Sequence, residues 1–276
     1  MNVKRQIKRR LQRYRDKHRT LKGLPLLTRV NLKMDKNNRL GYATTGLSLA
    51  PSNESMIVKI EGLKGKNTCR YASPTCRKAC LKEAGNNTWG SNQIARIAKT
   101  LFFVNYRDEF IGKLCNEIER FIKRCKKHKV KPAIRINILS DETELALLMA
   151  RMYPEVTFYD YTKEIKYWLD PANQYSKPSN YHLAYSLSEV NTEDWLNIMR
   201  TVPNARGAVV FYGDDLPKTF KGFPVVDGDA FDAFFMQKQK GAFVLGLKVK
   251  GLLQETKDIA LKGGFAQLGN KALLAA

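Results

Sequence analysis

The chain has 276 residues, of which 43% are hydrophobic, so it is long enough to bury a large core and form one α/β domain or two smaller ones. Its 48 Lys and Arg outnumber its 26 Asp and Glu, giving a net charge of +22, which favours a nucleic-acid partner, DNA before RNA, over a solvated basic surface or an anionic membrane. No apolar run approaches the about 20 residues that span a bilayer, and charges occupy the place of a signal peptide's apolar segment, so we expect a cytoplasmic protein without a transmembrane segment.

A basic arm comes first in the chain. Residues 1–23 contain ten Lys or Arg and one Asp, and their apolar residues recur at steps of three and four. This spacing predicts an amphipathic helix that ends at Gly23. The helix is expected either to contact phosphates or to be a solvated helix packed on the body. The candidate phosphate contacts are Arg9, Arg10, Arg13, Arg15 and Lys17.

Beyond the arm, residues 24–276 are expected to form one α/β domain in which strands alternate with helices. Strands are predicted at 46–50, 133–139, 156–161, 181–187, 207–212, 224–226 and 242–249, and helices at 92–127, 142–152 and 193–200. The alternation favours a parallel sheet built from βαβ units. We predict a parallel (β/α) barrel-like fold, closed or partly open, with a doubly wound open sheet as the alternative.

Three cysteines lie in the loop at 68–90, which follows the first predicted strand. Cys69, Cys76 and Cys80 have the spacing C-x6-C-x3-C. Three thiolates in one short loop are typical of a zinc site or an iron–sulfur cluster with one position left for another ligand, and free thiols are the alternative. Cys115 and Cys125 lie in a helical pattern and are expected to pack as ordinary side chains.

Polar residues recur where the predicted strands end, and functional groups gather at that edge of a parallel sheet. These candidates for a substrate or nucleotide cleft are Arg135, Asn137, Asp141, Tyr161, Lys163, Asp227 and Asp229. Each also has an ordinary interpretation, such as a helix cap for Asp141 or a turn around Gly228. The polar face of the predicted helix at 92–127 adds Arg96 and Lys99 as candidate phosphate contacts.

The ordered series of motifs resembles the bacteriophage gene product 88 family over about residues 44–250. The motifs are Leu47-Ser48-Leu49-Ala50-Pro51, the cysteine spacing with Arg77-Lys78-Ala79-Cys80, Ala95-Arg96 with Lys99-Thr100, Arg135-Ile136-Asn137 before Asp141, Tyr161-Thr162-Lys163, and Asp227-Gly228-Asp229. The resemblance implies a phage or plasmid origin, and hence the cytoplasm of a host cell. It implies no particular reaction.

A cysteine loop directly after the first strand of an α/β barrel is also similar, more distantly, to radical S-adenosylmethionine enzymes. In those enzymes three cysteines hold a [4Fe-4S] cluster whose open iron binds the cofactor, although their spacing is C-x3-C-x2-C. We therefore expect a nucleic-acid-binding protein whose [4Fe-4S] cluster, on Cys69, Cys76 and Cys80, lies beside the strand-end cleft. The alternatives are a cluster-dependent enzyme that acts on a nucleotide or nucleic acid, and a DNA-binding scaffold with structural zinc.

Overall fold

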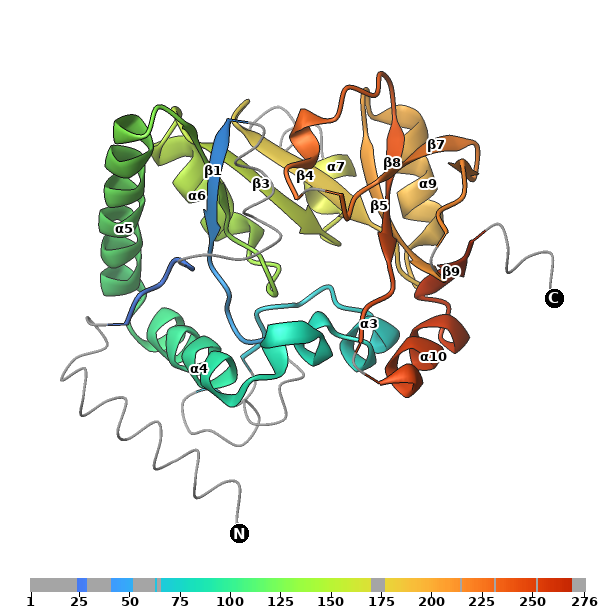
Figure 1. The fold of residues 1–276 in the computed structure, drawn as a ribbon, viewed down its shortest axis with the longest axis horizontal. Helices are drawn as coiled ribbons and strands as arrows, with labels where there is room; N and C mark the ends of the chain where they lie inside the picture. The colour runs from blue at the N-terminus through green and yellow to red at the C-terminus, as the bar shows by residue number, and fades with distance from the viewer. Residues whose placement is uncertain are drawn as a thin grey trace, which may run out of the picture.

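The computed structural model describes residues 24–28, 41–51, 63, 66–169, 177–213, 215–230, 232–251 and 253–269. The predicted basic helix and its candidates Arg9, Arg10, Arg13, Arg15 and Lys17 lie outside the described residues. The described part is an α/β fold around a nine-stranded, mostly parallel sheet (Figure 1). The coarse prediction of a parallel α/β protein is therefore confirmed.

The sheet is open. Its strands are β1 (Tyr42–Gly46), β2 (Lys131–Arg135), β3 (Thr157–Thr162), β4 (Tyr181–Ser186), β5 (Arg206–Tyr212), β6 (Thr219–Phe220), β7 (Phe223–Asp227), β8 (Phe243–Lys248) and β9 (Ala266–Leu268). They follow the order β1-β2-β3-β4-β5-β8-β7-β6, with β9 paired to the last residues of β5. The barrel-like fold, predicted as closed or partly open, is not confirmed, and its closed form is wrong, because the antiparallel hairpin of β6 and β7 ends the described sheet opposite β1.

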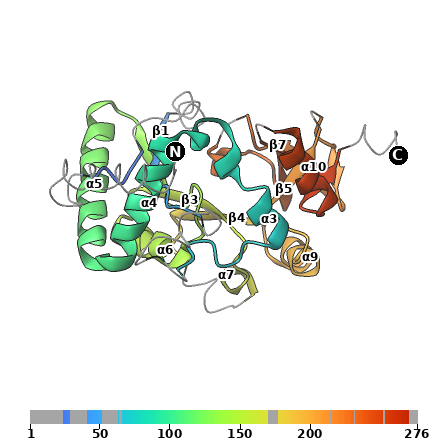
Figure 2. The same ribbon diagram turned by 90° about the horizontal axis from the view of Figure 1, so that it is seen from below.

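Helices lie beside the sheet and across the carboxyl ends of its strands. They are α3 (Pro74–Lys78), α4 (Gly90–Asn105), α5 (Arg107–Lys127), α6 (Thr143–Met152), α7 (Lys166–Leu169), α9 (Thr192–Thr201) and α10 (Gln254–Lys262), with the short 3-10 turns η4 (Leu81–Glu83), η5 (Gly85–Thr88) and η6 (Phe234–Met236). Helices α5, α6 and α9 contact β2, β3 and β5 respectively. Helices α3, α4 and α10 lie at the carboxyl ends of the strands, which Figure 2 shows from below.

The single helix predicted at 92–127 is two helices in the structure. Tyr106 breaks it with φ −141° and ψ 59°, and its N–H donates to the carbonyl of Phe102 as the last bond of α4. Asp108 and Glu109 then fall in the first turn of α5, where acidic side chains interact favourably with the helix dipole. The break turns the chain so that α5 lies beside the sheet and α4 lies below it (Figure 1).

Strand β1 begins and ends four residues earlier than the strand that we predicted at 46–50. Leu47 and Leu49 are fully buried but lie beyond β1. Leu47 instead donates its N–H to the carbonyl of Arg135 and bridges to Leu27. The apolar run at 46–50 therefore reflects burial under helices rather than strand pairing.

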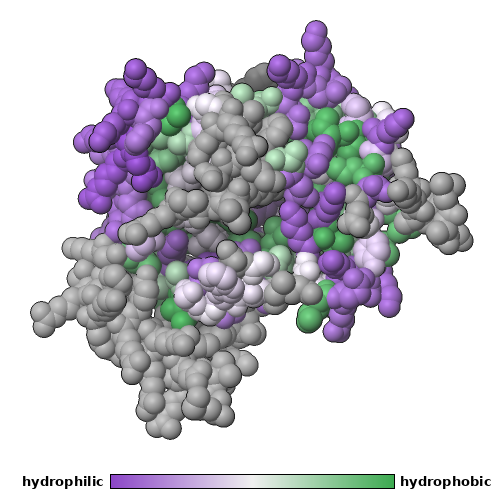
Figure 3. Space-filling model, in the orientation of Figure 1, coloured by the Kyte–Doolittle hydropathy of each residue, from purple (hydrophilic) through white to green (hydrophobic). Residues whose placement is uncertain are grey.

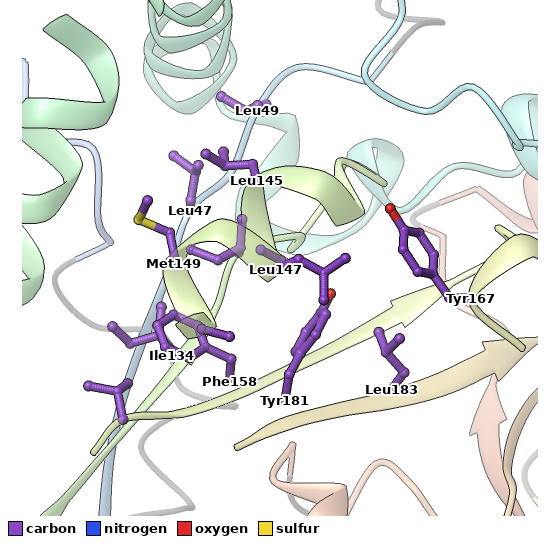
Figure 4. Packing of buried hydrophobic residues seen from close by; sticks show 14 of the residues in the cluster. Leu47, Leu49, Ile134, Leu145, Leu147, Met149, Phe158, Tyr167, Tyr181 and Leu183 are labelled. Atoms are coloured by element: carbon purple, nitrogen blue, oxygen red, sulfur yellow. The ribbon is translucent and has the colours of Figure 1, made fainter. Parts of the chain in front are cut away.

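The main hydrophobic core lies between the sheet and its helices. In Figure 4, Leu145 and Met149 of α6 lie against Leu47, Ile134 and Phe158, and all five side chains are fully buried. Each large apolar side chain removed from water in this way stabilises the fold by about 1.5–3 kcal/mol. This packing holds β1, β2 and β3 in place and so fixes where their carboxyl ends lie.

Helix α5 is amphipathic and covers one side of this core. Phe110, Leu114 and Ile118 recur at helical spacing and are fully buried. The opposite face of α5 is hydrophilic, as the left side of Figure 3 shows. The other face of the sheet holds a smaller cluster, in which Phe234 of η6 packs against Tyr159 of β3.

Candidate functional site

A cavity of about 330 Å³ lies at the carboxyl ends of β2, β3, β4, β5 and β8. All three clustered cysteines line it, from the loop at residues 68–90, which we call the Cys loop. Six of the seven predicted cleft residues line it as well: Arg135, Asn137, Asp141, Tyr161, Lys163 and Asp229. The structure therefore brings together side chains that are up to 160 residues apart in the sequence, from Cys69 to Asp229.

Two buried glutamates fasten the start of the Cys loop to the strand ends. Arg70 forms an ion pair with Glu142 after β2, with 3.3 Å between Nη2 and Oε2. Tyr71 donates its hydroxyl proton to Glu164 after β3, at 2.9 Å. Glu142 and Glu164 are only 6% and 4% exposed, so these contacts anchor the loop from beneath.

A third glutamate, Glu189 after β4, fastens the next turn of the loop. Its two carboxylate oxygens accept from the Ser73 hydroxyl at 2.7 Å and the Thr75 N–H at 2.8 Å. Burial alone would raise the pKa of Glu189, but the bonds from Ser73 and Thr75 lower it, so the carboxylate is the favoured form. The Cys loop is thus fixed at three successive strand ends.

Local structure sets the position of each cysteine. Ser73 caps α3 by accepting from the N–H of Cys76 at 3.2 Å, and Pro74 occupies the first turn, where its missing N–H costs nothing. Cys80 stands at the start of η4. Cys69 donates its thiol proton to the carbonyl of Leu139, with 3.1 Å between sulfur and oxygen.

The three thiols influence one another electrostatically. The pKa of Cys69 is raised to about 12, mainly by burial and also by the negative charges of Cys80, Asp141 and Cys76. Lys163 opposes this shift. Burial alone would lower the pKa of Lys163, but the charges of Cys76, Asp141 and Cys69 raise it. A cationic group beside the thiols, in addition to Lys163, would favour the ionised form of the thiols.

No group of three or more His, Cys, Asp or Glu side chains in the described part of the chain is arranged to hold a metal ion. The three cysteines share a cavity, but they do not form a completed ion site. The fourth ligand that the sequence leaves open is therefore not assigned to a described residue.

Asn137 has a structural role in the wall of the cavity. Its N–H donates to Asp160 Oδ1 at 2.7 Å, and its side-chain oxygen accepts from Ser140 and from the N–H of Glu142, both at 2.8 Å. Tyr181 also donates to Asp160, at 3.2 Å. Burial raises the pKa of Asp160 to about 7. Sequence patterns did not predict Asp160 as a residue of this site.

Asp141 connects the ends of two strands to the Cys loop. Its N–H donates to the carbonyl of Thr68 at 2.7 Å, and its carboxylate accepts from the N–H of Lys163 at 3.0 Å and the hydroxyl of Thr143 at 3.3 Å. Burial raises its pKa. Asp141 lines the cavity, and the N-cap of α6 is Glu142, so the helix-cap interpretation of Asp141 is wrong.

The wall formed by β2 and β3 carries a buried ion pair. Arg135 lies 3.0 Å from Asp232, whose other oxygen accepts from Tyr159 at 2.9 Å. The guanidinium lies 4.6 Å from the centre of the Tyr161 ring, within the range of a cation–π interaction. Arg135 Nε and the Tyr161 hydroxyl are buried and have no hydrogen-bond partner among the described residues. Sequence patterns missed Asp232, because it lies 97 residues from Arg135.

Asp229 and Asp227 differ in their positions. Asp229 lines the cavity, contacts Lys250 at 2.6 Å and accepts from the N–H of Lys248 at 2.8 Å. Asp227 does not line the cavity. Its carboxylate accepts from the N–H groups of Asp229 and Ala230, as expected for the turn around Gly228.

Arg96 and Lys99 lie in the interior, not on a basic surface. They are 3% and 7% exposed, and they donate to the backbone carbonyls of Asn87 at 3.1 Å and Leu26 at 2.8 Å. Burial lowers the pKa of Lys99 to about 8. The prediction that Arg96 and Lys99 contact phosphates is wrong, because residues 24–28 and the Cys loop cover this face of α4.

Fold and site together define a parallel α/β protein with a ligand-sized cavity at its strand ends and three cysteines in the cavity wall. The model of a family described as Gene product 88 matches residues 25–265. The chain therefore belongs to the gene product 88 family, as its motifs indicated. Comparisons with curated proteins and with solved structures found no match. None of the described helices has the length and hydropathy needed to cross a bilayer.

Proposed function

We propose that this protein is an iron–sulfur protein that acts on nucleic acid, with a [4Fe-4S] cluster held by Cys69, Cys76 and Cys80. The observation that carries the proposal is that all three cysteines line one cavity at the carboxyl ends of parallel strands. Thiolates are the usual ligands of such clusters, and three of them leave one iron for another ligand.

The chemistry of the donor set fits this group. Burial and mutual repulsion raise the pKa of Cys69, so ionised thiols are costly at this site without a partner of positive charge. Iron in a cluster supplies that charge and binds the deprotonated form. We favour the cluster over zinc because each thiolate of a [4Fe-4S] cluster binds a different iron, so the sulfurs need not meet around one ion.

The remaining residues of the cavity would bind and orient a ligand. Arg135 and Tyr161 line its wall, and their buried Nε and hydroxyl have no hydrogen-bond partner among the described residues, which leaves polar capacity at this wall. Lys163 would provide a positive charge beside the thiolates. A cavity of about 330 Å³ lies within the usual range for small-molecule sites.

Metal and sulfide analysis of protein purified without oxygen tests the cluster. We expect iron and acid-labile sulfide in equal amounts, together with visible absorption, in the parent protein. Changing Cys76→Ser should remove both, whereas Cys115→Ser is the matched control because Cys115 lies on α5, away from the cavity lining. Colourless protein without iron or sulfide contradicts the cluster, and zinc in its place supports a structural zinc site.

A cluster-dependent enzyme is the second candidate, favoured by the ligand-sized cavity that the three cysteines line. The open iron of a three-cysteine cluster would supply the chemistry, with S-adenosylmethionine as the candidate cofactor. Incubation of the reduced, cluster-loaded protein with S-adenosylmethionine tests this. Release of 5′-deoxyadenosine supports the enzyme, and an intact cluster that releases none leaves a binding role.

The nucleic-acid partner is supported by the net charge of +22. Affinity for an oligonucleotide should then fall steeply as the salt concentration rises, because binding releases counterions from phosphates. Deleting residues 1–23 should reduce the slope of that dependence. Affinity that is independent of salt contradicts phosphate contacts.

A further inference from the structure

The outer face of the Cys loop exposes large apolar side chains. Tyr71, Leu81 and Trp89 are 40%, 45% and 60% exposed. Of the three, Leu81 itself lines the cavity, whereas Tyr71 and Trp89 lie one and two residues along the chain from the lining residues Ala72 and Asn87.

The same face is basic. Arg70, Arg77 and Lys78 are exposed on the Cys loop, and Lys250 is exposed across the cavity from them. Arg77 also lines the cavity. The acidic partners beneath the loop are buried, Glu142 at 6% exposure and Glu164 at 4%. A molecule that approaches the Cys loop thus meets its cations while Glu142 and Glu164 remain beneath, whereas Lys250 is paired with Asp229 of the cavity wall.

The exposed groups are held in place before any partner binds. The hydroxyl of Tyr71 is bonded to Glu164, and Arg70 is paired with Glu142. Lys78 is in the last turn of α3, whose first turn is fixed by Ser73 and Glu189. A surface fixed in this way loses little conformational entropy on binding.

We propose that single-stranded nucleic acid lies across the mouth of the cavity, with phosphates on the cations of the Cys loop and bases stacked on Trp89 and Tyr71. Positive grooves with interleaved aromatic rings bind single strands in this way, whereas the bases of a duplex are already stacked on each other. A single strand can also present an unpaired base toward the cavity beneath, which a duplex cannot. This inference rests on the nucleic-acid partner proposed above. The candidate phosphate contacts are now the exposed cations of the Cys loop in place of the buried Arg96 and Lys99.

The test measures fluorescence anisotropy of a labelled DNA oligonucleotide, of its duplex and of the RNA of the same sequence, with the full-length cluster-loaded protein. We expect both single strands to bind more tightly than the duplex, and Lys78→Glu to weaken single-strand binding about tenfold and to lower the salt slope. Lys127→Glu makes the same charge change at the exposed end of α5, away from the cavity, and should leave binding unchanged.

The aromatic contact is tested separately. Trp89→Ala should weaken single-strand binding about tenfold, and Trp89→Phe should retain most of it because a phenyl ring still stacks. Iron is measured in the same samples, so loss of the cluster is distinguished from loss of binding. Unchanged binding by Lys78→Glu and Trp89→Ala, or tighter binding of the duplex, overturns the proposal that single strands bind at this surface. Absence of binding by the parent protein overturns the nucleic-acid partner itself.

Discussion

The two sides of β2 and β3 contrast strongly. Toward α5 and α6, their side chains belong to a core of fully buried apolar residues such as Ile134 and Phe158. Toward the cavity, Arg135 and Tyr161 bury polar atoms that have no hydrogen-bond partner in the described part of the chain. Burying such groups costs free energy, whereas the apolar core supplies it. The contrast shows that the apolar side stabilises the fold, whereas the polar side, which lines the cavity, costs stability.

The largest expected effect belongs to the apolar side. Phe110→Ala should lower the free energy of unfolding by about 4 kcal/mol, because the variant leaves a cavity where a fully buried ring packs against Phe102 and Phe103. Urea denaturation measures the change. Leu148→Ala on α6, where the side chain is 37% exposed, is the control and should cost much less. Equal losses in the two variants contradict the assignment of this core.

The polar side of the sheet should make the free energy of unfolding depend on pH. The pKa of Asp160 is about 7 in the folded protein, above its ordinary value near 4, so the folded state binds the extra proton between these values. The resulting stability is complete below about pH 4 and is lost as the pH rises to about 7. The loss is roughly 3–4 kcal/mol at about 1.4 kcal/mol per pKa unit. Asp160→Asn should remove this contribution, and identical pH profiles for variant and parent contradict it.

Breaking the ion pair at the cavity wall should have the next largest effect on the free energy of unfolding. Asp232→Ala leaves the buried guanidinium of Arg135 and the hydroxyl of Tyr159 without their partner and should cost about 3 kcal/mol. Combining it with Arg135→Met should recover part of the loss, because no unpaired charge then remains. Thermal unfolding of the single and double variants checks this. A double variant that is less stable than Asp232→Ala shows that packing, not charge, dominates here.

The smallest effect distinguishes a ligand group from a structural one. Tyr161→Phe removes a buried hydroxyl that has no partner among the described residues, so stability should stay constant or rise by up to about 1 kcal/mol. Tyr181→Phe is the matched control, because its hydroxyl donates to Asp160, and it should lower stability by about 1 kcal/mol. A clear loss of stability in Tyr161→Phe shows that its hydroxyl has a structural partner.

Much of the fold follows from local patterns. The strands β2, β3, β4, β5, β7 and β8 lie within a few residues of their predicted positions, because β-branched and aromatic runs mark them. The break at Tyr106 was missed since neither proline nor glycine marks it. Strand β9 was missed because its three residues are defined only by pairing with β5.

The candidate site was predictable where it followed strand ends and not where it depended on distant contacts. Asp141, Tyr161 and Lys163 follow predicted strands and do line the cavity. The glutamates that hold the Cys loop contact residues 72 to 116 positions away, and no local pattern encodes such a pair. Arg96 and Lys99 show the converse error, since a polar helix face looks exposed until another segment covers it.

In the function proposed above, Cys69, Cys76 and Cys80 hold a cluster whose remaining iron faces the cavity. A Mössbauer spectrum of the protein loaded with the iron-57 isotope and kept free of oxygen tests it most directly. We predict a [4Fe-4S] cluster in which one iron becomes distinct from the other three when a ligand enters the cavity. A protein that takes up no iron, or a cluster in which all iron sites keep thiolate ligands, contradicts the account.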